Sequence, residues 1–598
     1  MKRRDGSQKR GGSDRSIGGA STSTGMLALA LVAALPSAAC AATPAGSADI
    51  ILTNARVYTV EKQQPWAQAV AIKDGRILAV GSGAEIARRK GSGTKIVDLG
   101  GRLLMPSFGD AHTHPLFGGL SHSRCPIHSG KNPKEYQAII ADCVAKAPGT
   151  ALLFGVGWGE TAFPGNAPHK ETLDAISRDR PLAFESGDGH SLWVNSAALT
   201  MAGITKDTPD PAGGKIGRDP KTGEPTGALY EESAKALVMK FVPPPAPADI
   251  ENSILYTMRH FNSLGITNWR DAGVEFAEDG SSAMVEAYRA VRDRGQLDMH
   301  VVIDLKWQNE RGVDQIPGLL RAAERAKSYG LHADSVKYYL DGVIPQKTAA
   351  MIEPYEGTTE RGKSTIPVAT LNEAIATLEA KGLQAHVHAI GDRAVREGLD
   401  AFAAARTRNG AKDSRHLISH LNVIDPADQP RFGQLGAYAV FQPTWASNYE
   451  YMDLSKAAIG PKRSGYIYPA GSVLRAGGKL AYGADWPVAT ANPLEGLEVA
   501  VTRTDFAKPE TGPLLPDEGV TLAQAVTAHT INVAEVNRND KETGSIAPGK
   551  SADLVVLDRN IFDIPVAEIS EAKVLLTLFA GKPVFGSVGS LSAGASGQ

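Results

Sequence analysis

Residues 105–115 read Met105-Pro106-Ser107-Phe108-Gly109-Asp110-Ala111-His112-Thr113-His114-Pro115, and they continue an apolar run into two histidines placed two positions apart. On a β-strand, residues i and i+2 point to the same face, so both imidazoles can converge on one metal ion at the carboxyl end of the strand. Such a pair also occurs in ordinary polar loops. It predicts a metal site only if other ligands lie at matching places in the chain.

Downstream of this run, strand-like and helix-like segments alternate, which is typical of a parallel sheet or barrel. Helical patterns cover residues 284–294, 316–329 and 371–380, and glycines suited to C-terminal caps follow them at 295, 330 and 382. The strand-like runs end near His114, Asp271, Leu305, Leu340, His388, His420, Trp445 and Trp486. Eight such units predict an α/β fold, a distorted TIM (β/α)8 barrel whose chemistry lies at the carboxyl ends of the strands.

The two ends of the chain share a different, short-period strand pattern. It predicts one composite β-sandwich built from residues 48–104 and 545–590, with a hairpin turn at Lys73-Asp74-Gly75-Arg76. The barrel then comprises residues 105–117 and 249–544. Because the first strand ends near His114 and the second begins near Gly265, residues 118–248 are expected to form an insertion or lid domain after the first barrel strand.

Composition and charge exclude several classes of protein. The 598 residues are 42% hydrophobic and 21% charged, which fits a folded soluble protein and not a disordered or fibrous one. Lys and Arg number 63 against 65 Asp and Glu, for a net charge of −2. No basic surplus points to nucleic acid or to an anionic membrane surface. We expect a small-molecule substrate, and a homodimer is compatible with the sequence.

The first 41 residues have the order of a secretory signal peptide. Basic residues precede a short apolar run at residues 26–35, and small residues around Cys40 suit cleavage near Ala41. A run of about ten residues is too short for a stable membrane span. We therefore predict a periplasmic or secreted protein with no stable membrane span after cleavage. A lipoprotein anchor on Cys40 is a weaker alternative, because Ser37 stands where a lipid-attachment box normally has Leu.

Three cysteines, with no CxxC pair, exclude a disulfide-framework scaffold and a zinc ribbon. In an oxidising compartment the two that remain after cleavage, Cys125 and Cys143, are able to pair. Two free buried thiols are the equal alternative.

Four further candidates for a metal centre lie at the ends of predicted barrel strands. They are Lys337, His388, His420 and Asp485, on the fourth, fifth, sixth and eighth strands. A barrel brings these ends together, and imidazoles and carboxylates suit Zn²⁺ and similar ions. A buried lysine costs free energy unless its charge is removed, which carbamylation by CO₂ would do. We expect His386 and His416 to be structural, or His386 to support a ligand.

This ordered set resembles that of the amidohydrolase superfamily of metal-dependent hydrolases, in particular its YtcJ-like (amidohydrolase 3) branch. The resemblance covers about residues 50–585. It includes Asp188-Gly189-His190-Ser191-Leu192-Trp193-Val194-Asn195-Ser196-Ala197-Ala198-Leu199 and Gly544-Ser545-Ile546-Ala547-Pro548-Gly549-Lys550-Ser551-Ala552-Asp553-Leu554. It implies a divalent metal centre, two Zn²⁺ bridged by carbamylated Lys337. Its metal-site residues would be His112, His114, Lys337, His388, His420 and Asp485.

The sequence departs from the family pattern at a few places. Ser419 stands where relatives commonly have Glu, and Ala484 where many have Ser. Residues 343–347, Val-Ile-Pro-Gln-Lys, replace a more usual small-residue stretch. None of these changes removes a ligand, so they bear on the choice of substrate.

The resemblance implies hydrolysis of a C–N bond, in an amide or an N-acyl or N-formyl group, by a metal-bridging hydroxide. Asp485 would take the proton of the water and deliver it to the leaving nitrogen. His190 would bind the substrate carbonyl or the oxyanion, or else hold the insertion in place. Further substrate-binding candidates are Trp158, Tyr339, Trp445 and Trp486, although aromatic residues at strand ends are more often plain packing.

Two other functions stay open at this point. The same centre could act on an ester or lactone, because fold and metal do not fix the substrate. A non-catalytic regulatory member of the family would be expected to lack a ligand, and the sequence lacks none.

Overall fold

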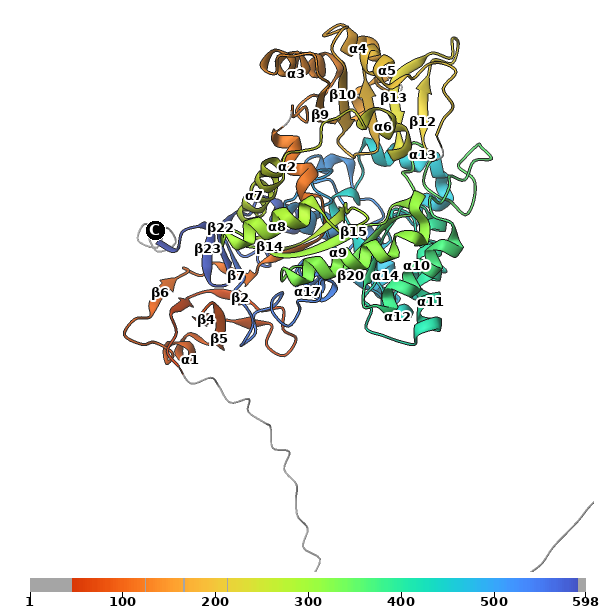
Figure 1. Ribbon diagram of the computed structural model, residues 1–598. Coiled ribbons are helices and arrows are strands. Elements are labelled where there is room, and N and C mark those ends of the chain that lie inside the picture. The colour runs from red at the N-terminus through yellow and green to blue at the C-terminus, as the bar shows by residue number, and fades with distance from the viewer. Residues whose placement is uncertain (1–45, 124, 165–166, 212, 590–598) are drawn as a thin grey trace, which may run out of the picture. The chain divides into compact units, whose positions relative to one another are not determined.

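Eight parallel strands form the central sheet, in the order β20-β19-β18-β17-β16-β15-β14-β8 (Figure 1). Their bounds are Lys479–Tyr482, Tyr438–Phe441, Leu417–His420, Gln384–Ala389, His332–Tyr339, His300–Lys306, Ile266–Val274 and Phe108–Thr113. Backbone hydrogen bonds from Asp485 N to His112 O (2.8 Å) and from His114 N to Trp486 O (2.9 Å) tie the last segment to the first. The sheet thus nearly closes on itself, which confirms the α/β fold with a distorted TIM barrel.

The computed structural model describes residues 46–123, 125–164, 167–211 and 213–589. The predicted signal peptide, with Cys40, lies outside the described residues. None of the helices among the described residues is both long and apolar enough to cross a membrane.

Helices between the barrel strands follow the predicted pattern. The three predicted helices are found as α8 (Ala283–Asp293), α9 (Ile316–Ser328) and α10 (Val368–Ala380). The glycines after them have φ of 67°, 69° and 90°, the left-handed geometry of a helix end. The other α-helices described in this region are α2 (Pro115–Ser123), α7 (Pro247–Ser263), α11 (Asp392–Asn409), α12 (Gln429–Leu435), α13 (Glu450–Ser464), α14 (Ala470–Arg475), α15 (Pro493–Thr502), α16 (Leu522–His529) and α17 (Ile531–Val536).

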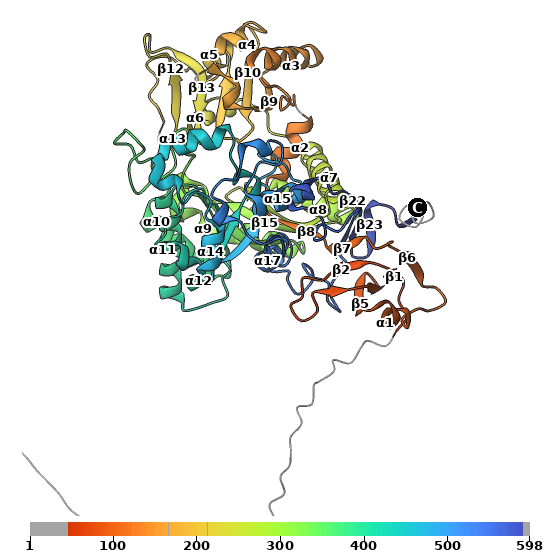
Figure 2. The same cartoon turned by 180° about the vertical axis from the view of Figure 1, so that it is seen from behind.

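Strands from both ends of the chain build two further sheets. One has the order β5-β4-β1-β6 (Arg76–Gly81, Ala69–Lys73, Ile50–Thr53, Lys95–Asp98), beside the short helix α1 (Gly83–Ala87). The other has the order β23-β22-β21-β7-β2-β3 (Lys582–Gly586, Val574–Phe579, Leu554–Leu557, Leu103–Pro106, Arg56–Tyr58, Trp66–Ala67). β21 and β7 are antiparallel, with Val555 opposite Met105, so one sheet joins the two ends of the chain (Figure 2). A hydrophobic cluster drawn from both sheets fills the space around Val57 and Val556.

The segment between β8 and β14 has its own sheet, in the order β12-β13-β11-β10-β9 (Figures 1 and 2). These strands are Lys215–Arg218, Pro225–Tyr230, Ser191–Val194, Leu182–Ser186 and Leu153–Trp158, and the helices with them are α3 (Pro133–Lys146), α4 (Lys170–Asp174), α5 (Ser196–Ala202) and α6 (Glu231–Met239). Two hydrophobic clusters, one around Leu192 and one around Trp193, lie on this sheet. We call this sheet and its helices the insertion sheet module.

Cys125 and Cys143 form a disulfide that ties the start of this module to α3. The bond closes a loop of 18 positions, which on a chain-entropy model stabilises the folded state by about 3 kcal/mol. We expect Cys143→Ser to lower the free energy of unfolding by about this amount in denaturant titrations without reductant. With reductant present, wild type and variant should unfold alike. Equal stability in the absence of reductant would show that the two cysteines are free thiols in solution.

Candidate metal centre

The carboxyl ends of the barrel strands carry the predicted metal-site residues. β8 holds His112 and leads directly to His114, β16 holds Lys337, β17 holds His388, β18 holds His420, and Asp485 follows β20. His420 and Asp485 have positive φ, 80° and 57°, which is uncommon for residues other than glycine. Backbone strain of this kind persists where the surrounding structure holds it, and it clusters at functional sites.

Asp485 lies at the middle of this group. Its Oδ1 is 3.2 Å from Nε2 of His112 and 3.1 Å from Nε2 of His114, and its Oδ2 is 3.8 Å from Nδ1 of His420. The ligand atoms of His112, His420 and Asp485 all lie within 4.8 Å of one another, and the three residues are buried. Burial acts to raise the pKa of Asp485, but His114, His420 and Lys337 outweigh it and hold the pKa below its usual value. The carboxylate is therefore an anion among imidazoles.

Lys337 is fully buried against this group. Its Nζ lies 3.2 Å from Nε2 of His112 and 5.1 Å from the centre of the Tyr339 ring. Burial lowers the pKa of the Lys337 amine to about 7. A large part of the amine is thus uncharged at neutral pH, the form that can react with CO₂.

His388 lies beside His420 in this group. The two rings are 4.4 Å apart, and Nε2 of His388 is 3.6 Å from Oδ1 of Asp341. Asp341 accepts backbone hydrogen bonds from Ala350, Ile390 and Gly391, which anchor its carboxylate beside β17.

Two buried atoms of this group lack a hydrogen-bond partner: Oδ1 of Asp485 and Nε2 of His388. Buried polar atoms normally have partners, so such exceptions need a reason. A carboxylate oxygen and imidazole nitrogens converging on one point are the donors that Zn²⁺ and similar ions use. The residues present therefore fit a divalent metal.

The join between β8 and β20 keeps His112 in place. Asp110 accepts hydrogen bonds from the backbone N–H groups of His112 (2.9 Å) and Ala484 (3.1 Å). Burial raises the pKa of Asp110 to about 7. A Cβ on Gly483 would lie 2.5 Å from the backbone N of His112, so only glycine allows this approach.

The insertion sheet module brings His190 to the metal centre. The His190 ring is 6.0 Å from the His388 ring, and its Nδ1 is 2.9 Å from Oε2 of Glu231. Burial alone would lower the pKa of His190, but the Glu231 carboxylate outweighs it and raises the pKa to about 9. His190 is therefore a cation at neutral pH. Glu231 has φ of 63° and also accepts a hydrogen bond from Thr348, in the segment that follows β16.

A second contact joins the module to the same barrel segment. Gln346 donates to Glu160, which also accepts from Ser191, the neighbour of His190. Gln346 is one of the residues in which the sequence departs from the family pattern. Burial raises the pKa of Glu160 to about 8, and the nearby Asp188 adds to the effect.

The predicted aromatic residues divide into two groups. Tyr339 and Trp445 lie at the centre, with rings 5.6 Å from His388 and 5.7 Å from His420. Trp158 is fully buried in the insertion sheet module, where its Nε1 donates to Phe184 O. Trp486 packs against Phe261 and His260. The structure thus brings two of the four aromatic residues to the histidines and places the other two in packing positions.

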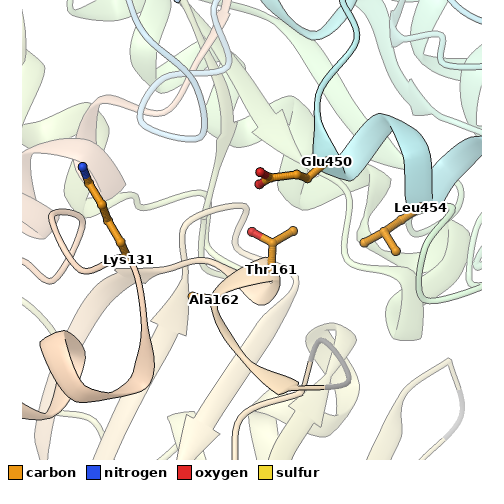
Figure 3. Close-up of a pocket in the computed structure, with 5 residues that line it drawn as sticks. All are labelled: Lys131, Thr161, Ala162, Glu450 and Leu454. Atoms are coloured by element: carbon orange, nitrogen blue, oxygen red, sulfur yellow. The ribbon is translucent and has the colours of Figure 1, made fainter. Parts of the chain in front are cut away.

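A cavity of about 390 Å³ lies between the insertion sheet module and α13 (Figure 3). Lys131, Thr161, Ala162, Glu450 and Leu454 line it, and Thr161 follows Glu160 directly in the chain. Figure 3 shows Glu450 and Thr161 facing one another across it. None of the predicted metal-site residues lines this cavity.

The sequence analysis missed three supporting residues: Asp304, which contacts Nδ1 of His386, Arg270, which donates to Asp304, and Glu231, which contacts His190. Asp304 gave a signal that was overlooked, since it is a charged residue inside the apolar strand Val301-Val302-Ile303-Asp304-Leu305. Glu231 gave none, because its contact with His190 depends on the fold of the insertion sheet module.

Comparisons with known proteins show the family to which the chain belongs. A model of the amidohydrolase family matches residues 95–585. Protein LONG AFTER FAR-RED 3 of Arabidopsis thaliana is 30% identical over 91% of this chain and 92% of its own. Putative amidohydrolase YtcJ of Bacillus subtilis (strain 168) is 27% identical over 88% of this chain and 98% of its own. N-substituted formamide deformylase of Arthrobacter pascens is 27% identical over 89% of this chain and 97% of its own.

Among solved structures, an uncharacterised metal-dependent hydrolase from Pyrococcus horikoshii OT3 superimposes with a TM-score of 0.66. It is 21% identical and the match covers 86% of this chain and 99% of that one. At this identity the likeness supports the fold.

Proposed function

The chain belongs to the amidohydrolase family, in its YtcJ-like branch, and from this membership we propose that it is a metal-dependent hydrolase of a carbon–nitrogen bond in an amide, N-acyl or N-formyl group. The observation that carries the proposal is the buried cluster of His112, His420 and Asp485, whose ligand atoms all lie within 4.8 Å of one another, with Nε2 of His114 3.1 Å from Oδ1 of Asp485. The bond class is supported by the relative named N-substituted formamide deformylase.

The residues that would hold the metal are the six at the strand ends. His112, His114 and Asp485 would surround one ion, His388 and His420 a second, and carbamylated Lys337 would bridge two Zn²⁺. When bound, such ions lower the pKa of water towards about 7 and polarise a carbonyl.

We assign the proton transfer to Asp485. Its carboxylate is ionised, so it can accept the proton of the attacking water and then deliver it to the leaving nitrogen. We assign oxyanion binding to His190, a cation whose Nδ1 lies 2.9 Å from Oε2 of Glu231 and whose ring lies 6.0 Å from that of His388. Its Nε2–H would donate to the substrate oxygen, where negative charge develops. Tyr339 and Trp445, whose rings lie beside His388 and His420, would provide apolar walls.

We expect His190→Asn to lower kcat by about 10² to 10³ fold and to leave the metal content unchanged, because the lost hydrogen bond is strongest in the transition state. Because the Glu231 carboxylate raises the pKa of His190 to about 9, activity should fall as pH rises through 9. Glu231→Gln should move this fall to lower pH. A profile in Glu231→Gln that matches wild type would show that His190 holds the insertion in place and does not act in the reaction.

Export to the periplasm or outside the cell also belongs to this proposal. The disulfide between Cys125 and Cys143 supports it, since disulfides persist mainly in oxidising compartments. Fractionation of cells that express the full chain tests it. Recovery in the cytoplasm with residues 1–41 intact would contradict it.

Screening the metal-loaded enzyme against N-formyl amines, N-acyl amino acids and lactones tests the bond class. Turnover of the first two groups is the expected result. Preference for lactones would replace the C–N assignment with ester hydrolysis. Metal binding without turnover of any group would favour a regulatory role.

A further inference from the structure

A line of buried polar side chains runs from His112 away from Asp485. Nδ1 of His112 lies 3.1 Å from Nε2 of His386, and Nδ1 of His386 lies 2.5 Å from Oδ2 of Asp304. Oδ1 of Asp304 accepts from Nη1 of Arg270 at 2.6 Å. All four residues have 0% exposed surface. We call this line the His112 relay.

The Asp304 end of the relay determines which ring nitrogen carries the hydrogen in each histidine. The Asp304 carboxylate only accepts, so Nδ1 of His386 carries the hydrogen and Nε2 of His386 is the acceptor. The hydrogen between the two rings therefore belongs to Nδ1 of His112. This leaves a lone pair on Nε2 of His112, the atom that faces Asp485.

We propose that Asp304 and His386 are positioning residues for the metal centre, which fix the tautomer and the ring orientation of His112 so that its Nε2 is presented to a divalent cation. A ligand histidine is commonly held this way by a carboxylate or carbonyl on its other nitrogen. Here a second imidazole lies between the ligand and the carboxylate, so the relay extends over two rings.

Rigid elements hold each member of the relay. His112, Arg270, Asp304 and His386 lie on β8, β14, β15 and β17, so four strands of one sheet set the distances. Arg270 also donates to Gln384, Asn537 and Ser335, which holds the guanidinium beside the Asp304 carboxylate.

Two further groups lie near Nε2 of His386, the acceptor atom of that ring. Ser419 Oγ lies 2.6 Å from Nε2 of His386, and Nζ of Lys337 lies 3.5 Å away. Ser419 is the position where relatives commonly have Glu. Ser419 carries no carboxylate, and the carboxylate that contacts His386 belongs to Asp304 on β15.

The test measures Zn²⁺ affinity by competition with a chromophoric chelator. Asp304→Asn and His386→Gln each should weaken binding by about 10 to 100 fold, the usual effect of losing such a supporting group. The two variants differ usefully: Asp304→Asn also removes the charge that faces Arg270, whereas His386→Gln keeps the Arg270–Asp304 pair. The matched control is Asp271→Asn, a buried barrel carboxylate bound to Tyr288 outside the relay. It should bind Zn²⁺ within about twofold of wild type.

Nitrogen-15 spectra of histidine-labelled, metal-free protein give a second readout that needs no metal. His112 and His386 should both appear as Nδ1–H tautomers, and His386→Gln should change the tautomer of His112. Wild-type affinity in His386→Gln, or an Nε2–H tautomer of His112 in wild type, would overturn the proposal. Equal loss of affinity in Asp271→Asn would assign the effect to general disruption of the barrel.

Discussion

Asp485→Asn is expected to keep its bound metal and to lose about 10² to 10⁴ fold in kcat on any substrate of the wild-type enzyme. An amide oxygen still fills the space between His112 and His114, where Oδ1 of Asp485 lies 3.2 Å and 3.1 Å from their Nε2 atoms. It cannot take up a proton at neutral pH, so the attacking water is no longer activated and the leaving nitrogen is no longer protonated.

Elemental analysis and kinetics on the same preparation distinguish a loss of bound metal from a loss of proton transfer. Asp271→Asn serves as the control, because it makes the same change in another buried barrel carboxylate. A variant that loses metal in parallel with activity would make Asp485 a ligand without a proton-transfer role. A metal-free wild-type enzyme with full activity would contradict the proposed chemistry as a whole.

Lys337→Met should lower the metal content from about two ions per chain to below one and reduce kcat by more than about 10³ fold. Methionine fills a similar volume in the fully buried site but cannot be carbamylated. Folding should be retained, since the variant removes a buried amine whose charged form burial already disfavours. The group lost is then the carbamate that we propose on Lys337.

Lys306→Met is the matched control for this experiment. Lys306 is opposite Lys337 in the ladder between β15 and β16, and its Nζ lies 2.7 Å from Glu275. This variant should keep the metal content of wild type. Mass spectrometry of intact wild-type protein, prepared with and without bicarbonate, checks the modification directly. Two bound ions in Lys337→Met would show that the lysine does not bridge them.

The barrel could be predicted from the sequence because its signal is local. Several strand-like runs end at chemically distinct residues, such as His388 and His420, and parallel strands in a barrel necessarily bring those ends together. The sequence also predicted the ends of helices, because Gly295 and Gly330 adopt positive φ where the helical pattern stops.

The supporting residues could not be predicted in the same way. The contact of Asp304 with His386 depends on the register of β15, β16 and β17, which no short stretch of sequence encodes. Trp158 is a second example. The sequence cannot distinguish an aromatic residue at a strand end that lines a pocket from one that, like Trp158, is buried in the core of the insertion sheet module. The sequence therefore predicts where a residue lies along its strand, but not which side chain it contacts.

The pairing of β7 with β21 has a consequence for synthesis of the chain. Met105 and Val555 are opposite one another, so the sheet that contains them lacks one of its central strands until the ribosome has made the chain through β21. Contacts between residues so distant in sequence form late, because a long loop must close first. The barrel is therefore expected to fold first, and a nascent chain that stalls before residue 554 exposes β7 as an open strand edge that invites aggregation.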